Sequence, residues 1–264
     1  MGERIIIDGH IHCGPRKFQG TGGFTSDARR NDKEVWNPIE RVKKGLEEAS
    51  VKGSVLIPFP EDIYRGPDGT PESAKTAHEY IVDIAKNNDY FYPFYFVWND
   101  FVIPDNLAEF KGIKWHRHFW EDSEYDYSDP KCDKFIKAIR KYDLPIIFEE
   151  SFENTKLFCD KYPDLKVIIP HVGLANGGAR NIIPRFKDSP NIYVDTALAY
   201  PFQIVEAMLQ FGADRVIFGS DKPYSSTKIE LYNLLEYDLT KNFSNEDIEK
   251  VLAKNILRLM HVSV

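Results

Sequence analysis

Two histidines, His10 and His12, stand one residue apart directly after the apolar run Ile5-Ile6-Ile7. Successive side chains of a β-strand point to opposite faces, so both imidazoles and Asp8 share one face if the strand continues through them. Neutral imidazole nitrogens are good ligands for zinc and similar divalent ions. The same spacing also fits a polar turn that closes a strand, and the pair alone does not decide between the two.

Further polar groups follow other apolar runs. His171 comes directly after KVIIP, Asp221 comes directly after RVIFGS, and Glu149 and Glu150 end the run PIIFEE. Each has an ordinary explanation on its own, as a loop histidine, a helix N-cap or a solvated pair of carboxylates. Taken together, three histidines and one or two carboxylates match the ligand types of a hydrolytic zinc-like site.

The elements that must position these groups are short apolar runs that alternate with amphipathic segments. Most of the runs are nearly continuous in hydrophobic residues, which is typical of parallel strands covered by helices. The predicted strands are Arg4–Asp8, Gly53–Pro58, Phe91–Trp98, Gly112–His116, Pro145–Glu149, Lys166–Pro170, Asn191–Asp195 and Arg215–Gly219. The predicted helices are Pro38–Ser50, Ser73–Asn87, Pro130–Tyr142, Glu153–Tyr162, Gly178–Lys187, Pro201–Phe211, Thr227–Leu239 and Asn245–Met260.

This alternation predicts an α/β fold, a (β/α)8 TIM barrel that forms a single domain over residues 1–264. The connection Asn99–Lys111 is short for such a barrel, and a doubly wound open sheet is the alternative. No glycine-rich phosphate loop follows an early strand, which favours the barrel. Active sites of TIM barrels lie at the C-terminal ends of the strands, where the polar groups fall. The segment Gly20–Asp27 is expected to be a long loop over that end.

Composition narrows the classes of function. The chain has 264 residues and a formal net charge of -7, which argues against a nucleic-acid partner. Three cysteines without a CxxC pair favour neither a disulfide framework nor a cysteine zinc site. No apolar run approaches the roughly 20 residues of a membrane helix, and the N-terminus does not fit a signal peptide. We expect a cytoplasmic protein that acts on a small-molecule substrate and has no nucleic-acid or membrane partner. The sequence leaves the oligomeric state open and is compatible with a homo-oligomer.

Five motifs, taken together, resemble the amidohydrolase superfamily. They are IDGHIHCG, GIKWH, LPIIFEES, VIIPHVG and VIFGSDKPY, and the C-terminal NEDIEKVLAKNILRLM is similar to a closing helix of the same group. The nearest resemblance is to the amidohydrolase-related branch, which holds hydrolases and non-oxidative decarboxylases such as aminocarboxymuconate semialdehyde decarboxylase. The resemblance spans nearly the whole chain.

The resemblance implies a role for each matching position. His10 and His12 match the metal ligands of the first strand. Asp221 matches an aspartate that binds or lies beside the metal and handles a proton of its water. His171 matches a metal ligand of two-metal members, or a residue that activates water or contacts substrate in one-metal members. The implied cofactor is a divalent metal, with zinc as the expected ion and manganese or another divalent ion as the alternative.

The fifth strand departs from the family pattern. Four residues after its proline the branch usually has histidine, and this chain has Glu149. A carboxylate can take that place as a metal ligand, and it shifts the preference of the site toward harder ions such as manganese. The alternative is that Glu149 is a buried partner of an arginine or lysine.

Three basic residues are candidates for substrate binding. Lys114 and His116, together with His118, have the same parity on the fourth strand, so at least two of them can face the mouth. We expect Lys114 or His116 to contact substrate. In some members of the superfamily a lysine of this strand is carboxylated and bridges two metals, which is the alternative for Lys114. Arg16, in the segment after the first strand, is a further candidate to contact substrate.

The sequence thus predicts a metal-dependent hydrolase that cleaves an amide, lactone or other ester of a small substrate. A metal-bound water would be the nucleophile, Asp221 would accept its proton, and His171 would polarise the scissile carbonyl. Asp8 is expected to orient the ligand imidazoles. One alternative is a metal-dependent, non-oxidative decarboxylase of an aromatic or dienoic acid. A second alternative is a catalytically decayed binding barrel.

Overall fold

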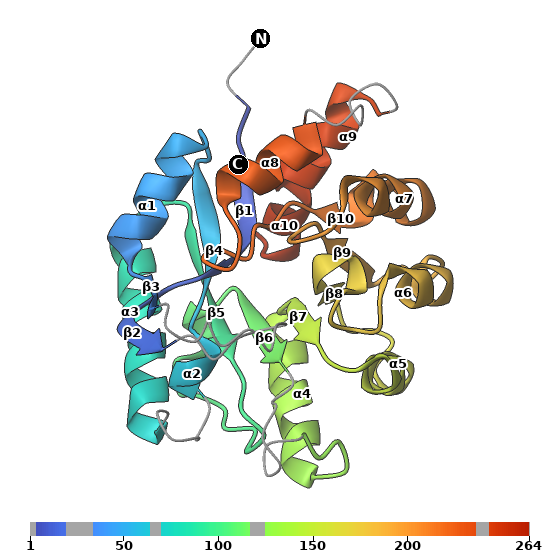
Figure 1. Cartoon of the computed structure of the whole chain (residues 1–264). Helices are drawn as coiled ribbons and strands as arrows, with labels where there is room; N and C mark the ends of the chain where they lie inside the picture. The colour runs from blue at the N-terminus through green and yellow to red at the C-terminus, as the bar shows by residue number, and fades with distance from the viewer. Residues whose placement is uncertain (1–3, 20–33, 64–69, 117–124, 236–242, 264) are drawn as a thin grey trace.

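Eight parallel strands stand side by side around a common centre (Figure 1). The computed structural model describes residues 4–19, 34–63, 70–116, 125–235 and 243–263. The strand order is β1-β4-β5-β6-β7-β8-β9-β10, so each barrel strand pairs with the next one along the chain. Their bounds are β1 (Ile7–His12), β4 (Gly53–Ile57), β5 (Phe91–Phe96), β6 (Gly112–His116), β7 (Ile146–Glu149), β8 (Val167–Ile169), β9 (Ile192–Asp195) and β10 (Val216–Ile217).

The ring closes between β1 and the segment that follows β10. The amide of Gly9 donates to the carbonyl of Phe218, the amide of Asp221 to that of His10, and the amide of His12 to that of Lys222, each at 2.8 Å. A side chain at Gly9 would meet Ile217 Cγ2 and Phe218 O at 2.8 Å, so glycine permits this close approach. The fold is a nearly closed TIM barrel in one α/β domain, which confirms the predicted barrel over the open sheet.

Helices cover the outside of the ring (Figure 1). The outer faces of the strands pack against them in one large apolar cluster that includes Ile11, Trp115 and Phe148. The helices are α1 (Ile39–Glu48), α2 (Pro60–Ile63), α3 (Pro71–Asn87), α4 (Pro130–Tyr142), α5 (Phe152–Lys161), α6 (Ala179–Phe186), α7 (Pro201–Phe211), α8 (Thr227–Leu235), α9 (Asn245–Glu249) and α10 (Asn255–Leu259). The predicted bounds of α4 and α7 agree with the structure at both ends.

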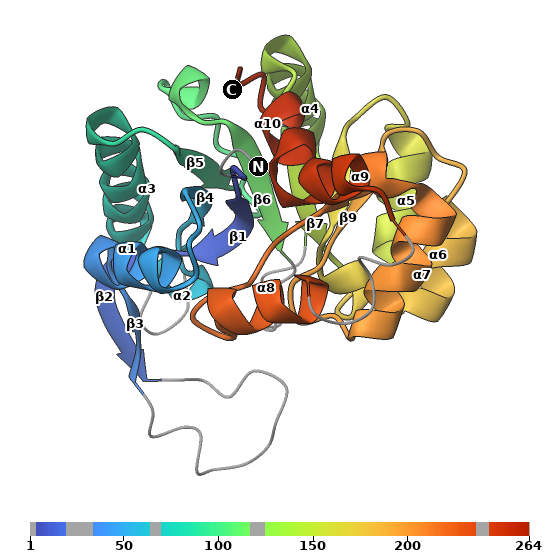
Figure 2. The same ribbon diagram turned by 90° about the horizontal axis from the view of Figure 1, so that it is seen from above.

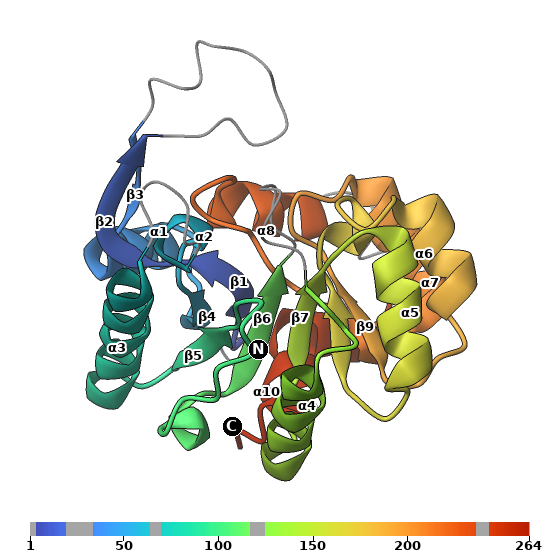
Figure 3. The same ribbon diagram turned by 90° about the horizontal axis from the view of Figure 1, so that it is seen from below.

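A second apolar cluster fills the inside of the barrel. It joins inward side chains of the strands, such as Ile7, Phe94 and Ile168, to Ile256 and Leu257 of α10. The C-terminus lies on the opposite side of the molecule from α8 and β2 (Figures 2 and 3). The barrel is therefore a packed core at the α10 end, and polar groups can gather only toward the carboxyl ends of the strands.

Strand β1 starts three residues later than predicted and continues to His12. Its pairing with β4 is irregular between Asp8 and Ile11, where three residues of β1 advance against two of β4. The extra residue interrupts the alternation of faces, as a β-bulge does. The prediction that Asp8 shares a face with His10 and His12 is therefore wrong. Asp8 accepts hydrogen bonds from Ser220 N at 2.9 Å and Thr227 Oγ1 at 3.1 Å.

Several elements were not predicted. A hairpin of β2 (Gly14–Gln19) and β3 (Glu34–Asn37) follows β1, and the short helix α2 follows β4. The C-terminal helix is not continuous, because a π-helical stretch at Lys250–Lys254 separates α9 from α10. Between β5 and β6 the structure has one 3-10 turn, Leu107–Glu109, which agrees with the short connection seen in the sequence. The segment Gly20–Asp27 lies outside the described residues.

Within the described part of the chain, no helix has both the length and the apolar character needed to cross a membrane.

Candidate metal centre

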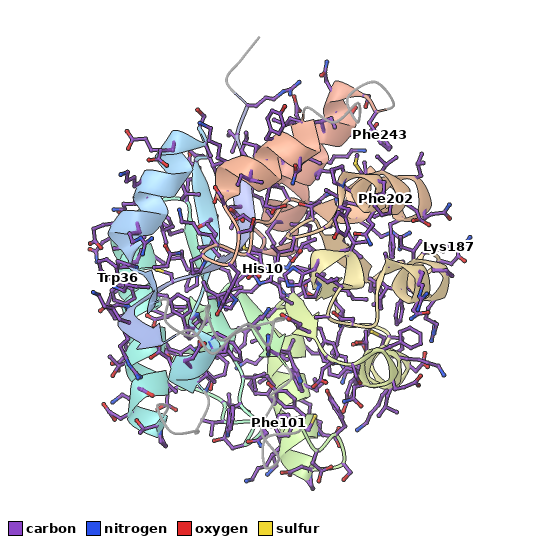
Figure 4. The ribbon with its side chains drawn as sticks, in the orientation of Figure 1. His10, Trp36, Phe101, Lys187, Phe202 and Phe243 are labelled. Carbon is purple, nitrogen blue, oxygen red and sulfur yellow. The ribbon has the colours of Figure 1, made fainter. Side chains whose placement is uncertain are left out.

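His10 lies at the centre of the ring of strands, and its side chain is fully buried (Figure 4). His12 is buried beside it, with the two ring centroids 5.6 Å apart. His171 stacks on His10 from the segment after β8, at a centroid distance of 5.2 Å. The three histidines that the sequence singled out therefore come together at the carboxyl ends of the strands.

Each of these rings has its Nδ1 atom against an oxygen acceptor. His10 Nδ1 lies 2.9 Å from Asp195 Oδ2, His12 Nδ1 lies 3.0 Å from the carbonyl of Pro58, and His171 Nδ1 lies 3.1 Å from the carbonyl of Ala197. Carboxylate and carbonyl oxygens only accept hydrogen bonds, so Nδ1 carries the proton of each neutral ring. The Nε2 atoms therefore keep their lone pairs for a ligand.

Asp221 faces two of these Nε2 atoms. Its Oδ1 lies 3.5 Å from His10 Nε2 and 3.4 Å from His12 Nε2. Ligand atoms of His10, His171 and Asp221 all lie within 4.8 Å of one another. We call His10, His12, His171 and Asp221 the donor cluster. Two imidazole lone pairs and one carboxylate in this arrangement fit a divalent metal ion, and His12 Nε2 beside Asp221 is a further donor.

The backbone at two positions of the donor cluster is in the left-handed region. His171 has a φ of 60° and Asp221 a φ of 54°, and Val172 beside His171 has a φ of 47°. This conformation is rare for residues other than glycine, most of all for a β-branched one, and it concentrates at functional sites. The amide of His171 donates to Asp195 Oδ1 at 2.8 Å, which holds the turn in place.

Asp195 is a residue that the sequence analysis did not single out. It ends β9, is buried, and receives the ring proton of His10 and the backbone proton of His171 on its two oxygens. A carboxylate that fixes the orientation and tautomer of a ligand histidine is typical of metal centres. The available signal was its place as the last residue of an apolar strand run, the same place that Glu149 occupies.

Basic and acidic groups meet beside the donor cluster. Lys114 Nζ lies 2.8 Å from Glu149 Oε2 and 3.3 Å from His10 Nε2. His116 Nε2 lies 3.3 Å from Glu149 Oε1, and His171 Nε2 lies 3.9 Å from Glu149 Oε2. Lys114 and His116 both face the mouth, as their parity predicts, while Glu149 has a lysine partner in the structure.

Burial and these charges set the protonation of the site. Burial, reinforced by the Lys114 charge, lowers the pKa of His10 to about 4, and burial also holds the pKa of His12 well below its usual value. Burial lowers the pKa of His171 as well, but Glu149 and Asp221 outweigh it and raise that pKa to about 9. Burial raises the pKa of Asp221 to about 7.

The family model described as amidohydrolase matches residues 7–262, nearly the whole chain. The chain belongs to the amidohydrolase family. This agrees with the resemblance of its motifs and with the donor cluster at the carboxyl ends of the strands. A search of curated proteins finds no match.

Solved structures share the fold of this amidohydrolase over almost their whole length. A 2,6-dihydroxybenzoate decarboxylase in complex with 2,6-dihydroxybenzoate matches with a TM-score of 0.70 at 15% identity, over 99% of this chain and 100% of that one. A dihydroxybenzoic acid decarboxylase from Polaromonas sp. JS666, with manganese and 2-nitroresorcinol bound, matches with a TM-score of 0.69 at 15% identity, over 99% and 97%. A probable 2-pyrone-4,6-dicarboxylic acid hydrolase from Acinetobacter baumannii, with citric acid bound, matches with a TM-score of 0.64 at 14% identity, over 97% and 99%.

The remaining predicted residues that the structure describes have partners other than the donor nitrogens of the cluster. Arg16 is on β2, and its Nη1 donates to Asp62 Oδ1 of α2 at 2.9 Å. Asp8 accepts a hydrogen bond from the backbone amide of His10 at 3.2 Å. Among the described residues it contacts no imidazole nitrogen, so the expectation that it orients the ligand rings is wrong. Glu150 turns away from Glu149 and accepts from Tyr127 and Asn154. His118 lies outside the described residues.

Proposed function

We propose that this amidohydrolase is a metal-dependent carboxy-lyase that releases CO2 from a small aromatic or dienoic carboxylic acid. The observation that carries the proposal is the pair of basic residues on β6. Lys114 and His116 stand beside the donor cluster, with Lys114 Nζ 3.3 Å from His10 Nε2. The Lys114 ammonium has three N–H donors, so it can hold Glu149 and still donate to a carboxylate substrate beside the cation site. Two of the three structural relatives described above are decarboxylases of hydroxylated benzoates, which supports the same reaction.

A divalent metal held by the donor cluster would supply positive charge that binds oxygens of the substrate and stabilises negative charge as it develops. Zinc and manganese both fit a set of three imidazoles and one carboxylate. The relative from Polaromonas sp. JS666 has manganese bound. Asp195 and the carbonyls of Pro58 and Ala197 hold the imidazoles with Nε2 toward the centre.

The reaction needs one proton. The bond between the carboxyl carbon and the neighbouring carbon breaks, its electron pair stays on the latter carbon, and a proton replaces the CO2 that leaves. We assign delivery of this proton to Asp221, because a carboxyl group that holds an ion through one oxygen can carry a proton on the other.

Aromatic side chains line the same end of the barrel. Phe59 stacks on His12 at a centroid distance of 5.8 Å, and Tyr224 meets His12 edge-on at 5.6 Å. Phe96 lies 6.1 Å from His116. Planar rings pack well against such side chains, which favours a planar substrate.

Hydrolysis of a lactone or other ester is the second candidate. The match to a probable 2-pyrone-4,6-dicarboxylic acid hydrolase favours it, and the same donor cluster could activate water. In that reaction Asp221 would accept the proton of the water rather than donate one to carbon.

Product analysis separates the two reactions. The purified chain, loaded with manganese or zinc, is incubated with hydroxybenzoates, a carboxylated methoxyphenol and a pyrone dicarboxylate, and the products are followed by ¹³C NMR. We expect CO2 and the decarboxylated ring from at least one acid, with loss of activity after chelation of the metal. Ring opening of the pyrone without CO2 would establish the hydrolase instead. The variant Asp221→Asn is the control for contaminating enzymes.

A further inference from the structure

Lys114 has an unusual position for a lysine. Its side chain is fully buried inside the mouth of the barrel, on a strand whose neighbouring residues Ile113 and Trp115 pack outward into the core. A buried ammonium is costly unless it is paired and hydrogen-bonded. Lys114 meets this need with Glu149 Oε2 at 2.8 Å. Its 3.3 Å contact with His10 Nε2 uses the lone pair that an ion would take, so Glu149 is the partner that would remain with a metal bound.

Both carboxylate oxygens of Glu149 contact side chains of β6. Its second oxygen, Oε1, lies 3.3 Å from His116 Nε2. If Glu149 turned to a metal, Lys114 would lose its carboxylate partner while buried beside a second cation. The two residues are therefore a matched pair in which each neutralises the other.

We propose that the Lys114 ammonium keeps Glu149 out of the coordination shell of the metal. The metal is then held by the donor cluster alone, and Glu149 acts as the buried counter-ion of Lys114. The ion pair also requires that Lys114 is a free amine. Carboxylation would place a second anion 2.8 Å from the Glu149 carboxylate, where like charges repel.

The charge balance of the site has a consequence for the substrate. Because Lys114 and Glu149 neutralise each other, Asp221 is the one carboxylate of the donor cluster that can offset the two positive charges of an ion. If Glu149 were also a ligand, two carboxylates could neutralise the ion. A centre that keeps net positive charge suits a substrate that enters as a carboxylate anion. This inference rests on the proposed function only in taking the donor cluster as a metal centre.

Cobalt absorption spectra report the ligands of the metal directly. The full chain is freed of metal, titrated with Co²⁺ and compared as wild type, Glu149→Gln, Lys114→Met and the double variant. We expect Glu149→Gln to keep the band positions and intensity of wild type, since Glu149 is not a ligand. We expect Lys114→Met to give a new spectrum and to bind Co²⁺ about tenfold more tightly, since Glu149 is released to the ion. The double variant should return to the wild-type spectrum.

Two outcomes overturn the proposal: a changed spectrum in the neutral double variant, or an unchanged spectrum in Lys114→Met. If Lys114→Met fails to fold, the neutral double variant still carries the test, and it must match wild type. The exposed substitution Lys131→Met on α4 is the matched control. No substrate is present in these measurements, so their failure is distinct from a failure to release CO2.

Discussion

Asp195 Oδ2 lies 2.9 Å from Nδ1 of His10, while Asp221 faces the Nε2 atom of the same ring. The two ring nitrogens of His10 thus have different roles. Asp195 holds the proton on Nδ1, and the lone pair of Nε2 is directed to the centre of the donor cluster. Because Asp195 also receives the amide of His171 at 2.8 Å, it couples the first strand of the barrel to the turn after β8.

Replacement of Asp195 should weaken metal binding without removing a ligand. Asparagine has one acceptor oxygen where aspartate has two, so in Asp195→Asn either His10 Nδ1 or the amide of His171 loses its acceptor. We expect the affinity for Mn²⁺ or Zn²⁺ to fall about 10–100-fold, as is usual when a group that orients a ligand is changed. A competitive chelator titration measures this. Equal affinity in wild type and variant would contradict the role, and the exposed Asp105→Asn is the control.

Replacement of Asp221 should remove the proton donor. We expect the turnover of Asp221→Asn to fall at least about 100-fold, because an amide cannot donate the proton that a carboxylic acid supplies. Initial rates at saturating metal and substrate check the prediction, and the metal content of each sample is measured in parallel. If fully loaded variant and wild type turn over at the same rate, Asp221 is not the proton donor.

Much of this arrangement could be predicted from the sequence. The apolar runs mark the strands, and their order puts His10, His12, His171 and Asp221 at one end of a barrel, where the structure places them. The pairing of Lys114 with Glu149 could not be predicted, because it depends on the register of β6 against β7, in which Lys114 pairs with Ile147 and His116 with Glu149.

The errors have physical causes. The alternation of side chains along a strand predicts that Asp8 lies on the same face of β1 as His10 and His12. The irregular pairing of β1 with β4 adds one residue to β1 between Asp8 and Ile11, so the Asp8 side chain lies on the opposite face. Asp195 was missed because an aspartate at the end of a strand has no distinctive spacing. Its role arises only because the ring places β9 between β8 and β10, close to β1.

The pair of Arg16 and Asp62 should make stability depend on pH. Burial raises the pKa of Asp62 to about 6, and Arg16 opposes that rise. In Arg16→Ala the pKa of Asp62 in the folded state rises further. Keeping Asp62 ionised in the folded protein at high pH therefore costs more free energy in the variant than in wild type. We expect the variant to lose about 1–2 kcal/mol of unfolding free energy at pH 8 and less at pH 5, a modest loss because Arg16 is partly exposed. Denaturant unfolding at both pH values measures the difference.

Equal losses at pH 5 and pH 8 would show that Asp62 does not depend on Arg16 for its charge. The same variant tests whether Arg16 contacts substrate, as the sequence predicts. In that case the KM for the carboxylic acid rises while kcat is retained.

His78 should contribute to acid sensitivity away from the metal centre. In α3 it is buried, its Nδ1 donates to the carbonyl of Ala74 at 2.7 Å, and its Nε2 accepts the amide of Phe96 at 2.9 Å. Burial lowers its pKa to about 4 from an unfolded value of 6.5. The unfolded state therefore binds the proton first as pH falls, and stability is lost between about pH 6.5 and pH 4.

The variant His78→Gln isolates this contribution. In metal-free protein, we expect wild type to lose about 2 kcal/mol more unfolding free energy than the variant between pH 7 and pH 4.5. Urea unfolding at a series of pH values gives the change of unfolding free energy with pH for each protein. Comparing these changes, rather than the absolute stabilities, removes any pH-independent destabilisation by the substitution. If the unfolding free energies of wild type and variant change equally with pH, His78 is not a buried histidine that stays neutral in the folded state.

The metal content of the purified full chain tests the central claim most directly. Wild type and the double variant His10→Ala/His12→Ala are incubated with excess Mn²⁺ or Zn²⁺, passed through a desalting column and analysed by mass spectrometry of the metal. The donor cluster predicts close to one divalent ion per chain in wild type and almost none in the variant. A wild type that retains no ion, or a variant that retains as much as wild type, would contradict a metal centre at His10 and His12.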